Sequence, residues 1–579
     1  MWILNQNLRL FFTLCVFISV LPLSALAEVI SNVTIQRNQA GYLPNSDKKI
    51  ILTGLPMPAG KQPGALLLDP EKRDWRRALA KKGAPVFAPE IKALGGGAWQ
   101  IDLSGYTSVG QYVLRIENTP TRANLLTDSL VKSGLIAPSP DSVVNSVPSL
   151  TLDIPLDITE SALWAPMTWA LRSIYMSRSG QPVIDEKTGT IRGAIQMQDA
   201  LLPDQSALFD AVGGWVDGGA DDRKTVKNNA WVTAMLLRLS AQNPRAIESL
   251  SLNYPPGTLR DESGRLSNIL VEATYGLEWL MAMQASNGSV YAGVISLPSN
   301  GQDNFSARVL QPPSALSTAI ATAVLAEGAR QLKPKNEALA VRCLLAAQRG
   351  WQWLSRQNEA PLSETTWAAM MLALVTQEPL YTKWIETHLS LATPSDLSSP
   401  AWLGWTAWAQ SGTNSTRNQA KTAFLEALRG QYLAQRSAAN ISDRANLSVW
   451  VAEAWRLTNQ SAYRDALVAT ANETLGENVL GQAFLTMPTP DDRLRWPQWP
   501  AAVRTPCHAL VRRPGDLIAG LLVSGPMLGT GRMKNPLPSY RDAAIRCVDN
   551  AASIAPTASF SYALGVLNTA MSASGQSSP

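Results

Sequence analysis

The sequence predicts two folded parts, a small antiparallel β-sandwich followed by a larger all-α toroid. The chain has 579 residues, too many for one hydrophobic core, and this length indicates two or three domains. Short, partly alternating apolar runs fill residues 29–116, as is typical of β-strands. From about residue 159 onward, apolar residues recur at helical spacing instead.

Composition narrows the class of protein. Hydrophobic residues make up 46% of the chain and charged residues 16%, which indicates a globular protein with well-buried cores. The net charge of +5 is small for this length and is not gathered into basic runs. We therefore expect no nucleic-acid partner.

Residues 1–27 resemble a secretory signal. An apolar run over residues 10–21 is followed by the small-residue exit Ala25-Leu26-Ala27. No later segment has the eighteen or more continuous apolar residues of a membrane span. We expect a mature protein without a membrane span, either secreted or periplasmic.

The β-sandwich is expected over residues 28–135. The segments KKIILTG, GALLLD, AWQIDLSG and GQYVLRIE are short and are separated by Gly, Pro and Asn. A connector rich in proline and serine is expected over residues 136–158.

The helical part is expected over residues 159–575. In SNILVEATYGLEWLMAMQ, residues Ile269, Ala273 and Leu277 share one face. The helices follow no short fixed period, which argues against a regular solenoid, and a closed double ring would bury their apolar faces. Two long helix-poor regions, 180–223 and 486–540, are expected to build a site, because long ordered loops usually do.

The stretch GGWVDGGADDRK holds Asp217, Asp221 and Asp222 within six residues. Crowded carboxylates are costly unless they face water, a metal or a reacting bond. Two interpretations are open. The aspartates serve a catalytic site, or they cap a helix or bind an ion.

Several motifs together resemble glycoside hydrolase family 9. NQAGYLPNSDKK resembles the entry strand of the immunoglobulin-like domain found before many of its catalytic domains. LVEATYGLEWLMAMQ and GGWVDGGADDRK resemble a helix and the aspartate loop of the catalytic domain. The resemblance implies an Ig-like β-sandwich followed by an (α/α)6 toroid, and an oligo- or polysaccharide partner of the β-glucan type.

The resemblance also implies an inverting mechanism with two carboxylates. One activates water and the other, as an acid, protonates the leaving oxygen, with roughly 6.5–9.5 Å between them. Asp217 matches the first aspartate of the family loop. With one inserted residue, Asp221 matches the base and Lys224 matches the family's lysine; Asp222 is the other candidate base.

The acid position departs from the family. The segment CVDNAASIAPTASFSYAL, 547–564, aligns with the family's acid-bearing segment without a gap and places Ala551 at the glutamate. An alanine cannot deliver a proton. Asp542 and Asp549 lie nearby in the sequence, but a shift of two residues at a helix entrance turns a side chain by about half a turn.

Candidate sugar-binding residues come from the long loops. Indoles stack well on sugar faces, whereas Trp402, Trp405 and Trp408, at three-residue steps, are expected to pack a helix interface. His508 matches the family's His-containing loop, with a packed loop histidine as the alternative. Arg493 and Arg495 have two interpretations: they bind an acidic sugar, or they are solvated charges of the loop. The candidates are Trp215, Trp496, Trp499, His508, Arg493 and Arg495.

Cysteines and histidines give no metal site. The spacing of Cys343, Cys507 and Cys547 resembles no zinc site, and the chain has only two histidines. The resemblance implies that Cys507 and Cys547 border one cleft, so we expect a disulfide between them and a buried thiol at Cys343. Three reduced cysteines are the alternative.

Three functions follow from these observations. The first is an exported carbohydrate-binding protein with hydrolysis lost or greatly reduced. The second is an active inverting hydrolase, endoglucanase-like, with a relocated acid. The third is a structural or protein-interaction role without a sugar. None of them calls for a cofactor.

Overall fold

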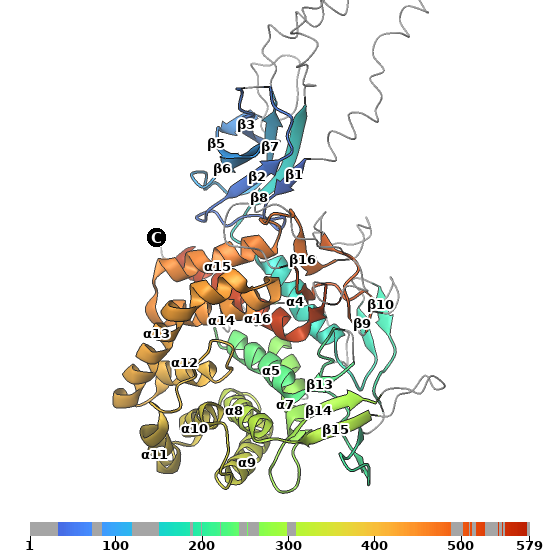
Figure 1. Ribbon diagram of the computed structural model, residues 1–579, viewed down its shortest axis with the longest axis vertical. Helices are drawn as coiled ribbons and strands as arrows, with labels where there is room; N and C mark the ends of the chain where they lie inside the picture. Colours follow the sequence, from blue (N-terminus) through green and yellow to red (C-terminus); the bar gives the residue numbers. More distant parts are fainter. Residues whose placement is uncertain are drawn as a thin grey trace, which may run out of the picture. The chain divides into compact units, whose positions relative to one another are not determined.

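The structure is a computed structural model of the chain (Figure 1). It describes residues 33–58, 60–71, 84–118, 150–185, 189–197, 200–219, 222–242, 250, 252, 266–297, 308–487, 502–508, 510–511, 517–526, 542, 547 and 550–575. The expected signal over 1–27 lies outside these residues. Two compact units form, one from Met1–Arg37 with Lys48–Asp157 and one from Asn38–Asp47 with Ile158–Pro579.

The first unit is the expected antiparallel β-sandwich. One sheet has the order β1 (Thr34–Gln36), β2 (Lys49–Thr53), β6 (Ala98–Asp102) and β5 (Glu90–Gly95). The other has the order β4 (Ala84–Phe87), β3 (Gly64–Asp69), β7 (Gly110–Glu117) and β8 (Thr151–Ile158).

Alternation along the strands makes the core of the sandwich. In β2, Ile50 and Leu52 are fully buried while their neighbours are half-buried, because successive side chains of a strand point to opposite faces. β8 occupies the end of the segment expected as a connector, which alternates with the same period of two.

The second unit is all-α apart from short strands in its loops. Its helices are α4 (Trp164–Met176), α5 (Val226–Ser240), α7 (Asn268–Ala282), α8 (Ala315–Leu332), α9 (Glu337–Leu354), α10 (Leu362–Thr376), α11 (Pro379–His388), α12 (Trp402–Ser411), α13 (Asn414–Ala438), α14 (Ile441–Thr458), α15 (Ser461–Thr474) and α16 (Ile554–Gly575).

These helices form the closed double ring that the sequence predicts. The inner ring runs α5, α8, α10, α12, α14 and α16, and α16 packs back on α5. Each inner helix has an outer partner: α7, α9, α11, α13, α15 and α4, in the same order. Inner helices are apolar nearly all round, because they are covered on every side. Trp402, Trp405 and Trp408 of α12 are fully buried or nearly so, as expected for a helix interface.

A buried ionic network joins four inner helices. Arg238 of α5 lies 3.3 Å from Glu327 of α8 and 3.2 Å from Glu453 of α14. Glu453 also accepts hydrogen bonds from Tyr562 of α16 and from Arg456. Removing one partner of such a network costs about 3–5 kcal/mol, because a charge is left buried and unpaired.

The two long helix-poor regions contain short strands. The first region contributes to a sheet with the order β12 (Leu208–Phe209), β11 (Ala200–Leu201), β15 (Arg308–Pro313), β14 (Tyr291–Ser296) and β13 (Lys224–Thr225), beside the hairpin β9 (Val183–Asp185) and β10 (Thr190–Arg192). The second contributes to a sheet with the order β17 (Ala502–Val503), β16 (Ala483–Thr486), β18 (Leu522–Val523) and β19 (Ala552–Ser553).

Among the helices that the structure describes, none combines the length and the apolar character that crossing a bilayer needs.

Candidate active site

Asp217 lies at the start of α5 and is bound to it. One carboxylate oxygen accepts from the Thr225 backbone N–H at 3.0 Å and from Asn229 Nδ2 at 3.3 Å. The other accepts from Thr225 Oγ1 at 2.6 Å and from Asn228 Nδ2 at 2.8 Å. The side chain therefore satisfies donors at a helix N-terminus.

Burial changes the acidity of this carboxyl group. Asp217 is 4% exposed, and loss of solvent raises its pKa to about 6, against the opposing effect of its hydrogen bonds with Thr225 and Asn228. A carboxyl group with this pKa exchanges its proton near neutral pH.

The other two aspartates of the loop, Asp221 and Asp222, are not shown to share the buried position of Asp217. Asp221 lies outside the described residues. Asp222 is half-buried, and its backbone carbonyl accepts from Gln196 Nε2 at 2.8 Å. Its charge partly opposes the lowering of the pKa of Arg308 that burial causes.

Lys224, at the end of the same loop, binds the chain that leads into it. Its ammonium group is fully buried and donates to Ser179 Oγ at 3.0 Å and to the carbonyl oxygens of Ala211 and Gly213. Burial lowers the pKa of Lys224 well below its usual value. This residue positions the loop through backbone carbonyls.

The aspartate loop lies directly against the segment that carries Ala551. The Gly219 N–H donates to the Ala552 carbonyl at 3.0 Å, and the Ile554 N–H donates to the Asp217 carbonyl at 3.1 Å. Gly218 has φ +104°, and a Cβ there would lie 2.2 Å from the Ala552 oxygen. Only glycine permits this approach.

Ala551 is fixed by backbone bonds on both sides. Its N–H donates to Ser524 Oγ at 3.1 Å, and its carbonyl accepts from the Ser524 N–H at 2.8 Å. The Ala552 N–H donates to Cys507 O at 3.0 Å. The position implied for the acid is therefore adjacent to the aspartate loop, and it carries a methyl group.

The nearby aspartates do not offer an obvious replacement. Asp542 accepts from the backbone N–H groups of Arg504 and Thr505 at 2.6 and 2.8 Å, and from the Thr505 hydroxyl at 2.7 Å. These bonds engage both of its oxygens in holding a loop. Asp549 lies outside the described residues.

His508 lies beneath the loop and not in an open cleft. It is 5% exposed and bridges to Gly219. Nδ1 accepts from the Leu510 N–H at 3.1 Å, so the proton of the neutral ring sits on Nε2, which has no hydrogen-bond partner among the described residues. Burial, with the nearby charge of Arg192, lowers its pKa to about 3.

The disulfide between Cys507 and Cys547 is present, with 5.2 Å between the Cα atoms. It joins the His508 loop to the chain just before Ala551. Cys343 is a buried free thiol, as expected, and burial raises its pKa to about 12.

The expectation that Trp215 stacks on a sugar is wrong. Its indole is fully buried, donates from Nε1 to Glu272 at 2.7 Å and packs on Tyr275 at 5.9 Å between ring centroids. Its neighbours Gly214 and Val216 are buried as well, so this part of the aspartate loop lies in the core. Trp496, Trp499, Arg493 and Arg495 lie outside the described residues.

An aromatic cavity of about 480 Å³ lies beside Asp217. Asn228, which binds the Asp217 carboxylate, is one wall, and Ala555, the second residue of α16, is another. Among the described residues it is lined by Lys227, Asn228, Trp231, Ile320, Trp367, Leu397, Ser398, Pro400, Gln435, Ala438, Ala439, Asp443, Asn446, Leu447, Trp450 and Ala555. We call this the aromatic cavity.

Three tryptophans line the aromatic cavity, and of these Trp231 is half-buried, whereas Trp367 is 0% and Trp450 2% exposed. Trp231 and Trp450 meet edge to face at 5.6 Å between centroids, and Trp367 lies on α10. They are not evident from the sequence because each lies on an inner helix that is apolar nearly all round, where a tryptophan resembles core. The available signal was the position of Trp231, two turns after the aspartate loop.

Among the described residues that line the aromatic cavity, the one carboxylate is that of Asp443, an exposed side chain. Partial desolvation raises the pKa of Asp443, against a backbone hydrogen bond at Asn440. Within the described residues, no group of three His, Cys, Asp or Glu side chains is arranged to hold a metal ion.

The toroid, the aspartate loop and the adjoining aromatic cavity define a carbohydrate-active class of protein, and comparison with known proteins names the family. The chain belongs to glycosyl hydrolase family 9, whose model matches residues 166–564.

Individual relatives are distant. Endoglucanase C of Cellulomonas fimi is 26% identical over 48% of this chain, and the match spans only 30% of that protein. A xyloglucan-specific endo-β-1,4-glucanase of Bacteroides ovatus is 22% identical over 70% of this chain and 68% of its own length. A crystal structure of a metagenome-derived family 9 endoglucanase superposes with a TM-score of 0.72 at 21% identity, over 93% of this chain and all of that one. This last likeness bears on the fold alone.

Proposed function

We propose that this protein is an exported member of family 9 that binds a β-glucan-type oligo- or polysaccharide in the aromatic cavity, with hydrolysis lost or greatly reduced. The single observation that carries the proposal is Ala551, fixed against the aspartate loop where the resemblance puts the general acid. The printed names of the relatives, which include a xyloglucan-specific glucanase, support the choice of a β-glucan.

The binding half of the proposal rests on the aromatic cavity. Its volume is about 480 Å³, within the usual range for small-ligand sites. The half-buried indole of Trp231 suits an apolar face of a glucan, with the buried Trp367 and Trp450 packed behind it. The side chains of Asn228, Gln435 and Asn446 supply groups for the hydroxyls of the glucan. Stacking of a tryptophan on a sugar contributes to binding even when no bond is cleaved.

The catalytic half rests on proton delivery. An alkoxide of a sugar is a poor leaving group, and general acid catalysis contributes about 10²–10⁴-fold to such a reaction. A methyl group at the acid position forfeits this contribution. An aspartate loop by itself activates water without helping the leaving group depart.

The test restores the missing acid. We expect Ala551→Glu to raise the rate of reducing-sugar release from a soluble β-glucan by at least tenfold over wild type. Ala551→Gln is the matched control, since it has the same shape without the acidic proton. An equal rise in both variants, or high wild-type turnover, would contradict the proposal.

A second candidate function, an active hydrolase with a relocated acid, is favoured by one observation. Asp443 is a carboxylate that lines the aromatic cavity, and partial desolvation raises its pKa in the direction that an acid requires. In that case Asp443→Asn would abolish turnover while leaving oligosaccharide binding intact, and wild type would release reducing sugar steadily.

A further inference from the structure

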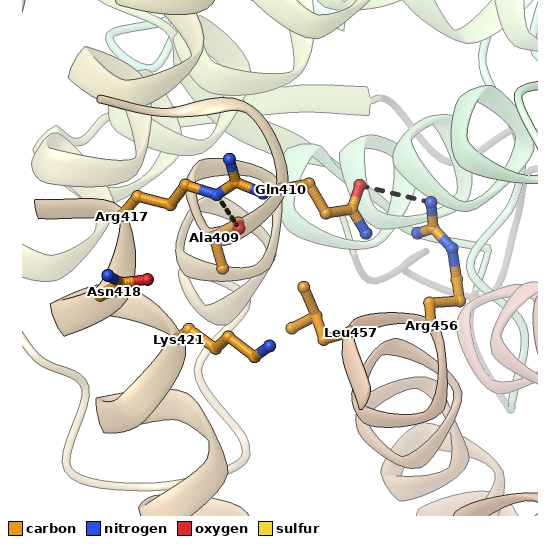
Figure 2. A pocket seen from close by; sticks show the side chains of 7 residues that line it. All are labelled: Ala409, Gln410, Arg417, Asn418, Lys421, Arg456 and Leu457. Carbon is orange, nitrogen blue, oxygen red and sulfur yellow. Dashed lines mark hydrogen bonds between the residues drawn. The ribbon is translucent and has the colours of Figure 1, made fainter. Parts of the chain in front are cut away.

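A second cavity, of about 340 Å³, is formed by residues of α12, α13 and α14 (Figure 2). It is lined by the last residues of α12 and α14 and the first turns of α13: Ala409, Gln410, Arg417, Asn418, Lys421, Arg456 and Leu457. We call it the basic cavity. The aromatic cavity uses α14 near Asp443, fourteen residues before Leu457, which is about 20 Å along a helix.

Positive charge in the basic cavity is not balanced by its own lining. Arg417, Lys421 and Arg456 all face it, and none of the seven lining residues is acidic. Figure 2 shows the three cations coming from two helices, with the Lys421 amine reaching toward Leu457 of α14. Like charges gathered in one hollow repel one another, so the site favours an anionic occupant.

The three cations differ in what they already bind. Arg456 is held by both oxygens of Glu453 at 3.1 Å and by Gln410 at 3.3 Å. Arg417 uses Nε for the Ala409 carbonyl at 2.9 Å. The Lys421 ammonium has no hydrogen-bond or ion-pair partner among the described residues. Two of the three charges therefore have no carboxylate to offset them.

Neutral donors and the helix field act in the same direction. Asn418 and Gln410 add amide groups to the lining. Arg417 and Asn418 lie on the first turn of α13, which begins at Asn414, and the N-terminal end of a helix favours negative charge. α13 has 25 residues, so this field is developed in full.

From these observations we propose that the basic cavity binds a phosphate-type oxyanion, either free phosphate or the phosphate group of a sugar ester. A planar guanidinium pairs with two phosphate oxygens at once, and a lysine adds a point charge. The volume holds a phosphate with room for an attached small group. The polar lining is unsuited to a neutral glucan, which the aromatic cavity accommodates.

The proposal is independent of whether the protein hydrolyses sugars. The cavity lies apart from Asp217, Ala551 and the disulfide, and it uses other residues. If the phosphate test fails, the proposed function still stands. If the proposed function fails, the phosphate proposal still stands.

The experiment is calorimetric titration of the full mature chain at low, constant ionic strength. The ligands are inorganic phosphate and glucose 1-phosphate, with glucose and chloride as controls. We expect saturable binding at one site for a phosphate ligand and none for the controls. Tighter binding of the ester identifies a sugar phosphate as the source, and tighter binding of phosphate identifies the free ion.

Variants locate the site. We expect Lys421→Gln to weaken phosphate binding about tenfold, and Lys421→Gln with Arg417→Gln to remove saturation, because charge-assisted bonds are lost. Arg429→Gln is the matched control, an exposed cation on the same helix outside the cavity. Absence of saturation in wild type, or an equal loss in Arg429→Gln, would overturn the proposal. Melting temperatures check that every variant folds.

Discussion

The disulfide gives a prediction with a magnitude that follows from the structure. Cys507 and Cys547 are separated by 40 residues, and in the chain-entropy model a crosslink of this span stabilises the folded state by about 4 kcal/mol. Changing both to serine should therefore lower the free energy of unfolding by up to this amount. The backbone bonds from Cys507 to Asn550 and Ala552 remain possible, so the fold should persist.

Urea denaturation followed by tryptophan fluorescence measures this difference. Reductant should lower the stability of wild type toward that of the double serine variant and leave the variant unchanged. Cys343 does not complicate the comparison, because a buried free thiol has no bond for the reductant to cleave and is left unchanged in the double serine variant. Equal stability of wild type with and without reductant, with the bond shown to be cleaved, would refute the reasoning.

Three further predictions concern the site. Because burial raises the pKa of Asp217 to about 6, the folded state binds more protons than the unfolded one between about pH 4 and 6. This carboxyl group then lowers stability by up to about 3 kcal/mol as pH rises through that window, and in Asp217→Asn the urea-derived free energy should lose this dependence. Gly218→Ala should destabilise by about 2–4 kcal/mol, since its Cβ meets the Ala552 carbonyl at 2.2 Å; an unchanged melting temperature would contradict the contact. Trp231→Ala should weaken cellohexaose binding about tenfold in a fluorescence titration, and Trp384→Ala on an outer helix should not; equal losses would argue against the aromatic cavity.

The architecture could be predicted from the sequence because the spacing of apolar residues within each strand or helix is a local property. Alternation in β2 and helical spacing in α7 need no knowledge of distant residues, and the double ring follows from burying those faces. Family motifs added the disulfide, since they placed Cys507 and Cys547 at one cleft.

The residues of the site were harder to predict because exposure depends on distant packing. Trp215 belongs to the aspartate loop, yet Glu272 of α7 draws its indole into the core. Trp231 looks like core in its helix, yet its indole is only half-buried and lines a cavity. No local pattern distinguishes these two indoles, because the helices that decide between them are far apart in the chain.

Asp217 performs two structural tasks that have no connection with sugar chemistry. Its carboxylate receives donors at the start of α5, the first helix of the inner ring, and its carbonyl receives the Ile554 N–H at the start of α16, the last. Asp217 thus connects α5 to α16, the two helices between which the inner ring closes. The aspartate side chain has a structural use at the start of α5, so its presence in a family 9 chain is not by itself a sign of catalysis. A chain that gave up hydrolysis would still use these contacts, because they connect the first and last helices of the inner ring.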